Sequence, residues 1–260
     1  MHIAVFVKRV LDPELPATEF RVDSQAKDAY APEAPYVMGP FDENALEVAL
    51  MVKDKLPGTR VSAISYGPPP EAEAILRKAL STGVDDALLV IEEAGLHDVF
   101  HVARVLAAAA RRAGSPDLLL FGLQSGDWDS GQTPFAVAEI LGAASVSHVS
   151  LVEPEQDGSL RLHRVLEQST EIVRLTAALV VASVTNDGRN ALRKAKVKDV
   201  LMARGRPVEQ LSALELGVSP VEMVAVSSVE AVARSSSSCA FMAGEDDGAK
   251  GRALVERLLS

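Results

Sequence analysis

The amino-acid sequence predicts an α/β protein built on a doubly wound, mostly parallel sheet, with extra antiparallel strands and a C-terminal arm. Short apolar runs alternate with helix-like segments through residues 1–145, and further strand-like runs follow within residues 146–184. Alternation of strands and helices is typical of parallel sheets that are covered by helices on both faces. Strands of such sheets are buried on both sides and therefore read as continuous apolar runs.

The alternating part of the chain contains four expected strands and four expected helices. Apolar residues at helical spacing define the first helix, and Asp42 is expected to cap its amino end. Gly83, Gly114 and Gly142 follow the other three helices, as is common at helix carboxyl ends. The expected strands are 3–7, 61–65, 87–91 and 117–121, and the expected helices begin at 42 and cover 71–81, 99–113 and 132–141.

Other regions lie outside this alternation. Five prolines within residues 11–40 predict an extended excursion between the first strand and the first helix. Residues 186–206 are basic and largely polar, and an expected helix at 249–259 ends a tail of the kind that often packs on a partner. An antiparallel or mixed addition to the sheet is predicted by strand-like runs at 146–152, 160–166, 171–175 and 178–184.

Charge and composition disfavour several functions. The formal net charge of −10 argues against a general affinity for nucleic acid, which requires a basic face. Cys239 is the single cysteine, so no intramolecular disulfide can form, and this fits a reducing compartment. No apolar stretch approaches the roughly 20 residues that span a bilayer, and residues 1–10 lack the layout of a signal peptide. We therefore expect a cytoplasmic protein without direct membrane insertion.

The most informative segment is the polar, glycine-rich loop of residues 122–133, which follows an expected strand and opens an expected helix. The first amides of a helix lack intrahelical acceptors, and the helix dipole there favours an anion. The Gly-Lys-Ser/Thr ending of a Walker loop is absent. Spacing alone leaves two interpretations: a nucleotide phosphate site, or a turn whose polar residues only satisfy the helix end. The loop offers Gly122, Ser125, Gly126, Asp127, Asp129, Ser130, Gly131, Gln132 and Thr133.

An ordered set of segments resembles the small, or beta, subunit family of electron-transfer flavoproteins. Residues 122–133 resemble the family signature Gly-Lys-Gln-Ala-Ile-Asp-Gly-Asp-x-x-Gln-Thr/Val, and residues 38–43 resemble its Asn-Pro-Phe-Asp-Glu turn. Residues 5–10 resemble the opening strand, 79–85 the Ala-x-x-Met-Gly-Ala-Asp motif, and 200–209 the basic stretch ending in Pro-Ile-Glu. The matches occur in the family's order and cover roughly residues 1–220.

The resemblance implies an adenine-nucleotide-hydrolase-like α/β domain at residues 1–208 that binds AMP, and an arm at residues 209–260 that packs on the partner subunit. It also implies FAD shared with the larger, alpha subunit, with Phe41 reaching toward the flavin ring. Leu123 and Trp128 depart from the signature, where Lys and often Gly stand, and Gly39 replaces the Asn of the turn. The implied cofactor-binding residues are Phe6, Gly39, Pro40, Phe41, Tyr66, Gly122, Ser125, Asp127, Asp129, Ser130, Gly131, Gln132 and Thr133.

The function implied by the resemblance is electron transfer by a subunit without bond-making catalysis of its own. Acyl-CoA or related dehydrogenases would reduce the flavin, and a quinone oxidoreductase would accept the electrons. Residues 189–200 match the family's partner recognition loop, with Arg193, Lys196 and Val197 as docking residues. Glu167 aligns with a glutamate near the interface with the flavin domain. Without the resemblance, the basic segment would be interpreted as a solvated loop.

Other functions have weaker support. In a bifurcating form, FAD would replace AMP in this subunit, but the Gln132-Thr133 ending resembles the AMP type more closely. The phosphate loop of ATP-binding regulatory domains such as universal stress proteins is absent, as is the Ser-Gly-Gly-x-Asp-Ser loop of nucleotide hydrolases. His97 and His101 have i,i+4 spacing but only carboxylates nearby, so we expect no metal site. No residue is expected to be catalytic.

Overall fold

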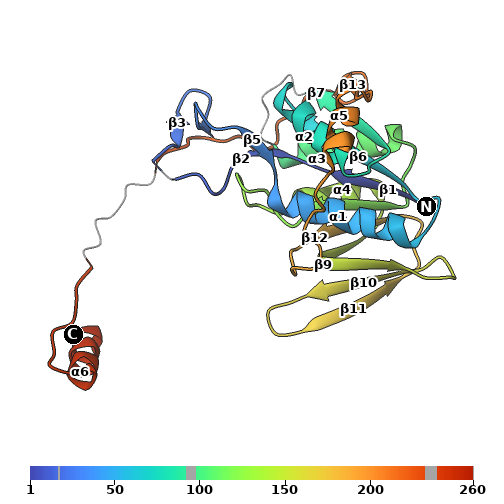
Figure 1. Cartoon of the computed structure of the whole chain (residues 1–260). Helices are drawn as coiled ribbons and strands as arrows, with labels where there is room; N and C mark the ends of the chain where they lie inside the picture. Colours follow the sequence, from blue (N-terminus) through green and yellow to red (C-terminus); the bar gives the residue numbers. More distant parts are fainter. Residues whose placement is uncertain (17, 92–97, 232–238, 260) are drawn as a thin grey trace. The chain divides into compact units, whose positions relative to one another are not determined.

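Nine strands form one sheet in the part of the chain that the computed structural model describes, namely residues 1–16, 18–91, 98–231 and 239–259 (Figure 1). The strand order is β11-β10-β9-β12-β8-β1-β6-β7-β13, and every neighbouring pair is parallel except β11/β10 and β10/β9. The predicted mostly parallel sheet with antiparallel additions is confirmed. Its strands are β1 (His2–Phe6), β6 (Arg60–Gly67), β7 (Asp86–Ile91), β8 (Leu118–Gly122), β9 (Ala144–Pro154), β10 (Leu160–Val165), β11 (Thr170–Leu175), β12 (Val180–Val184) and β13 (Glu209–Ser212).

Helices cover both faces of the sheet, as the doubly wound prediction requires. In β1, Ile3 and Val5 point to a core shared with α1 and α2, whereas Ala4 and Phe6 point to a second core shared with α3 and α4. This alternation follows from the two-residue period of a strand, whose successive side chains leave opposite faces. The helices are α1 (Pro40–Lys55), α2 (Glu71–Ser81), α3 (Val99–Arg112) and α4 (Thr133–Leu141).

The proline-rich excursion between β1 and α1 contains four short strands. They form two antiparallel pairs that are separate from the main sheet. Arg9 lies over the ring of Tyr36 across one of these pairs, with the guanidinium carbon 4.1 Å from the ring centroid. The strands are β2 (Arg9–Leu11) paired with β5 (Tyr36–Met38), and β3 (Arg21–Asp23) paired with β4 (Asp28–Tyr30).

The order of the parallel strands places a topological switch point between β1 and β8. From β1 the chain continues to β6 and β7 on one side, and then returns to β8 on the other side of β1. The connections on the two sides of a switch point leave in opposite directions, so a crevice opens at the carboxyl ends of its strands. Here those ends are followed by residues 7–8 and by the glycine-rich loop 122–133.

The expected capping role of Asp42 is wrong. Helix α1 begins at Pro40, with Gly39 as its N-cap and no side-chain cap. Proline suits the first helical position because the amide it lacks would have no intrahelical acceptor. Asp42 therefore lies inside the first turn, and its carboxylate accepts hydrogen bonds from the backbone amides of Lys8 (2.8 Å) and Gly122 (3.1 Å).

Besides the four short strands of the excursion, two further elements were not expected from the sequence. Helix α5 (Val197–Arg204) occupies part of the basic stretch and packs against α2. Strand β13 extends the sheet by pairing with β7, so residues 209–212 belong to the main fold. Within α5 only Ala203 is buried, and β13 is an edge strand with a polar sequence, so neither shows a clear apolar period.

The chain divides into two compact units, Met1–Val229 and Glu230–Ser260. The arm was expected to start at residue 209, whereas the larger unit continues to Val229. The smaller unit contains α6 (Asp247–Leu259), which starts two residues before the expected helix and buries none of its described residues. Its packing on a partner subunit stays a prediction. No described helix combines the length and the apolar character that a membrane span requires.

Candidate functional site

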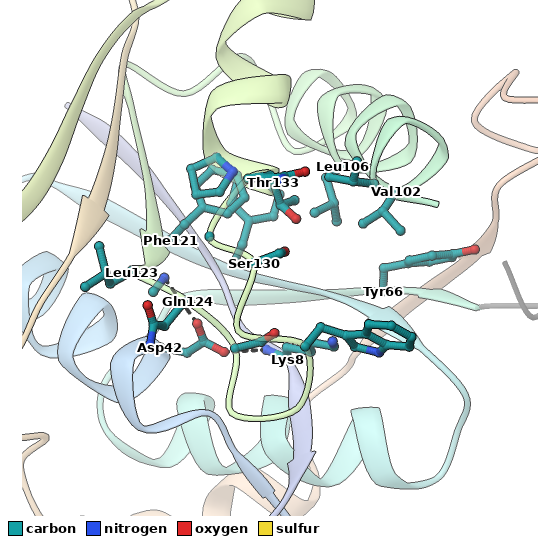
Figure 2. Close-up of a pocket in the computed structure, with 18 of the residues that line it drawn as sticks. Lys8, Asp42, Tyr66, Val102, Leu106, Phe121, Leu123, Gln124, Ser130 and Thr133 are labelled. Carbon is teal, nitrogen blue, oxygen red and sulfur yellow. Dashed lines mark hydrogen bonds between the residues drawn. The ribbon is translucent and has the colours of Figure 1, made fainter. Parts of the chain in front are cut away.

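A cleft of about 400 Å³ opens at the switch point, above the carboxyl ends of β1 and β8 (Figure 2). This volume lies within the range of roughly 300–1,000 Å³ that is common for small-molecule sites. The loop 122–133 forms one wall, and α3 contributes Val102 and Leu106 to another. Eight of the residues implied by the family resemblance line it, namely Phe6, Tyr66, Gly122, Ser125, Ser130, Gly131, Gln132 and Thr133.

One side of the cleft is apolar. The rings of Phe6 and Phe121 stack with centroids 4.2 Å apart and an interplanar angle of 5°. Val102 and Leu106 face the same space as Ser130 and Thr133, as Figure 2 shows. This wall offers a surface for a flat, weakly polar group, because such a group loses little hydration when it is buried there.

The other side carries backbone donors. The amides of residues 130–133, at the start of α4, donate to no protein acceptor within the described residues, and α4 has no side-chain cap. Gly131 adopts a φ of +61°, and a Cβ atom there would lie 3.0 Å from the carbonyl oxygen of Leu123. Unpaired amides at a helix start bind anions readily. The arrangement therefore suits a phosphate group.

Among the described residues that line the cleft, Lys8 is the one with a cationic side chain, and it forms an ion pair with Asp127 over 2.7 Å. Burial alone would raise the pKa of Asp127, but the charge of Lys8 and the hydrogen bonds to the carboxylate hold that pKa below its usual value. Because Lys8 is already paired, attraction of an anion at this site depends more on the backbone amides than on a free cation.

The remaining implied residues lie elsewhere. Asp127 lines a second hollow of about 300 Å³, which shares Lys8, Tyr66 and Trp128 with the cleft. Neither hollow is lined by the other four implied residues, Gly39, Pro40, Phe41 and Asp129.

Several lining residues were missed by the sequence analysis, among them Asp42, Val99, Phe100, Val224 and Val226. The last two lie in the segment that follows β13, more than 90 residues from the loop 122–133. Asp98 holds this segment by accepting hydrogen bonds from the backbone amides of Met223 and Val224. No periodicity in the sequence signals such contacts, since they depend on tertiary structure.

The predicted docking residues lie at the start of α5 and in the segment before it. Arg193 is held by Glu47, whose carboxylate it contacts at 2.8 Å, and by Asp54. Lys196 is the N-cap of α5, and Val197 is its first residue, with 78% of its surface exposed. Arg193 therefore has a structural role in this segment, whereas Val197 points into solvent.

Two smaller predictions concern Glu167 and the histidines. Glu167 is exposed and lies between β10 and β11, and its place at a domain interface stays a prediction. His97, which the sequence analysis considered together with His101, lies outside the described residues. Within the described residues, no group of three or more His, Cys, Asp or Glu side chains has the arrangement of a metal site.

Comparison with known proteins identifies the family. Residues 29–216 match the model of the electron transfer flavoprotein domain. The chain belongs to the electron transfer flavoprotein family. As a member of its beta-subunit group, it is one component of a heterodimeric electron carrier.

The relatives of this beta subunit extend over most of its length. It is 33% identical to electron transfer flavoprotein subunit beta of Thermoanaerobacterium thermosaccharolyticum, over 87% of this chain and 88% of the relative. It is 30% identical to the protein of the same name from Mycobacterium bovis, over 100% and 98%. It is also 31% identical to the caffeyl-CoA reductase-Etf complex subunit CarD of Acetobacterium woodii, over 85% and 81%.

Proposed function

We propose that this beta subunit binds AMP in the cleft and, together with a larger alpha subunit, holds the FAD that carries the electrons. The flavin would accept electrons from an acyl-CoA or related dehydrogenase and pass them toward a quinone oxidoreductase. FAD supplies the redox chemistry when it is bound, and the protein supplies binding and orientation. The observation that carries the proposal is the cleft at the switch point, in a chain of this family.

The cleft supports AMP through complementary walls. The four amides of residues 130–133 would hold the phosphate, and the side chains of Ser130 and Thr133 add neutral donors. The adenine base would lie against the apolar wall that includes Val102 and Leu106. Phosphate binding at a helix start needs no lysine, which is consistent with Leu123 at the position where the family signature has Lys.

Nucleotide analysis tests this proposal directly. We expect the chain co-produced with its alpha subunit to contain one AMP and one FAD per heterodimer, measured by mass spectrometry and absorbance after denaturation. The isolated chain should contain little flavin, because its sequence has no dinucleotide fingerprint. A purified heterodimer without any adenine mononucleotide would contradict AMP binding.

A second candidate is FAD in place of AMP in this subunit. The second hollow supports it, because it shares Lys8, Tyr66 and Trp128 with the cleft and so gives a longer ligand room to extend. The same extraction separates the candidates. Two FAD molecules per heterodimer and no AMP would support the second candidate, and full flavin occupancy of the isolated chain would do so as well.

Helix α5 carries the proposed docking surface for the dehydrogenase. Val197, Val200 and Leu201 occupy neighbouring positions on the helix and are 78%, 42% and 58% exposed. Exposed apolar side chains within a basic stretch suit a transient partner, since the apolar anchor fills a pocket and the charges guide the encounter.

Truncation of the anchor tests docking. We expect Val197→Ala to slow flavin reduction by the cognate dehydrogenase about tenfold, because a well-packed anchor contributes on the order of 1–2 kcal/mol. Stopped-flow measurement of flavin reduction gives the rate. Ile172→Ala is a matched control, because Ile172 is 60% exposed on the edge strand β11 and outside the proposed surface. Equal rates in the two variants would place the docking surface elsewhere.

A further inference from the structure

A single buried carboxylate connects the two strands of the switch point. Asp42 is 8% exposed and lines the cleft (Figure 2). Its Oδ2 atom accepts from the amide of Lys8, just after β1, and its Oδ1 atom accepts from the amide of Gly122, the last residue of β8. The Asp42 side chain, on α1, therefore fixes both the start of the loop 122–133 and the end of β1.

Two glycines leave space for this carboxylate. A Cβ atom at Gly39 would lie 2.7 Å from the Asp42 Oδ2 atom, and one at Gly122 would overlap the Oδ1 atom. Neither glycine has a positive φ, so backbone conformation does not explain their presence. Room for the Asp42 side chain does so at Gly122, where a Cβ atom would overlap the carboxylate.

We propose that Asp42 is a positioning residue of the nucleotide site, whose ionised carboxylate sets the loop 122–133 against the end of β1. The proposal rests on the proposed function only for the identity of the ligand. Each carboxylate oxygen accepts one amide bond, and both bonds are strongest when neither oxygen carries a proton, because a charged oxygen is a better acceptor than a hydroxyl.

The charge of Asp42 responds to pH near neutrality. Burial raises its pKa to about 7, although the two amide bonds and the nearby charge of Lys8 oppose this shift and Asp127 adds to it. On the same helix, Glu43 pairs with Lys78 and Glu47 pairs with Arg193. As pH falls below about 7, a proton on one oxygen makes that oxygen a donor and a weaker acceptor, and one amide bond is weakened.

The hold of Asp42 on the loop should strengthen as pH rises, but its contribution to the stability of the whole protein should change in the opposite direction. The pKa of Asp42 in the folded protein is raised from 3.8, so the folded state holds the proton more tightly than the unfolded state. The contribution of Asp42 to the free energy of unfolding therefore falls as pH rises from about 4 to 7, and stays constant above. A loop that is fixed more firmly at high pH, where Asp42 itself adds no stability, would separate positioning from a merely structural role.

The single tryptophan of the chain reports on the loop without any ligand. Trp128 lies within residues 122–133, so its fluorescence emission should change between pH 6 and 8 in the full-length protein. In Asp42→Asn the amide can accept only one of the two bonds, and this change should disappear. Asp86→Asn is the control, because Asp86 is a hydrogen-bonded carboxylate at the amino end of β7, whereas the cleft lies at the carboxyl ends of the parallel strands. Identical profiles in wild type and Asp42→Asn would overturn the proposal.

Titration of the same three proteins with AMP tests the effect on binding. We expect wild-type affinity to rise about tenfold as pH increases through 7, beyond the change caused by the phosphate itself, whose second pKa is about 6. Asp42→Asn should show only the phosphate contribution, and Asp86→Asn should match wild type. Affinity that increases as pH falls would also overturn the proposal. If wild type binds no AMP at any pH, the proposed ligand is wrong, and the Trp128 profile still decides the role of Asp42.

Discussion

Replacement of Gly122 by alanine is expected to lower the free energy of unfolding by about 3 kcal/mol, near the upper end of the range for overpacked sites. The new Cβ atom would overlap the Asp42 carboxylate. That carboxylate can rotate away only by giving up its hydrogen bond from the amide of Gly122. It would also lie 2.9 Å from the backbone nitrogen of Asp42 and 3.0 Å from the carbonyl carbon of Phe41. Backbone atoms cannot rotate away, so helix α1 would have to shift against β8.

Chemical denaturation measures this loss, and Gly126→Ala supplies a matched control in the same loop. The nearest atom to a Cβ at Gly126 is a methyl group of Val10 at 3.9 Å, and the backbone there has no positive φ. We expect that control to change stability by less than about 0.5 kcal/mol, as is usual away from packed sites. Comparable midpoints for the two variants would show that α1 and β8 are not closely packed at Gly122.

The strands and most helices could be predicted because they depend on local pattern. The apolar runs of β1, β6, β7 and β8 are buried on both faces, and each begins and ends within two residues of its expected position. The loop 122–133 could be predicted as a candidate site for the same reason, since its position after a strand and before a helix is a local property. The other residues that line the cleft could not be predicted in this way, because tertiary structure brings them together from distant parts of the chain.

Asp42 illustrates what could not be predicted. Its sequence position suggests a helix cap, but its partners lie 34 and 80 residues away, and they become neighbours only when β1 and β8 are adjacent in the sheet. The basic segment before α5 shows the same limit. Its charges indicate a solvated or docking loop, yet Arg193 has its principal partner 146 residues away in α1.

The ion pair between Arg193 and Glu47 leads to the second large expected effect. Arg193→Ala should lower the free energy of unfolding by about 2 kcal/mol, because hydrogen bonds to charged groups are worth about 1.5–3 kcal/mol and an unpaired buried charge adds a penalty. The guanidinium makes several bonds to Glu47, which raise the pKa of Arg193 above its usual value. Partial exposure of Arg193 to solvent keeps the figure below that of a fully buried pair.

Replacement of Glu47 should lower the free energy of unfolding by less than replacement of Arg193. This asymmetry is the sharpest test of the ion pair. The Glu47 side chain is 9% exposed and would remain as a buried carboxylate in Arg193→Ala, whereas Arg193 is 34% exposed and would keep Asp54 in Glu47→Gln. We therefore expect Glu47→Gln to cost about 1 kcal/mol, and the double variant to be no less stable than Arg193→Ala. The measurement is a double-mutant cycle, in which the denaturant midpoints of wild type, the two single variants and the double variant are compared. Strictly additive losses would mean that the two side chains contribute independently, and Arg193 would then be available for docking as the sequence alone suggests.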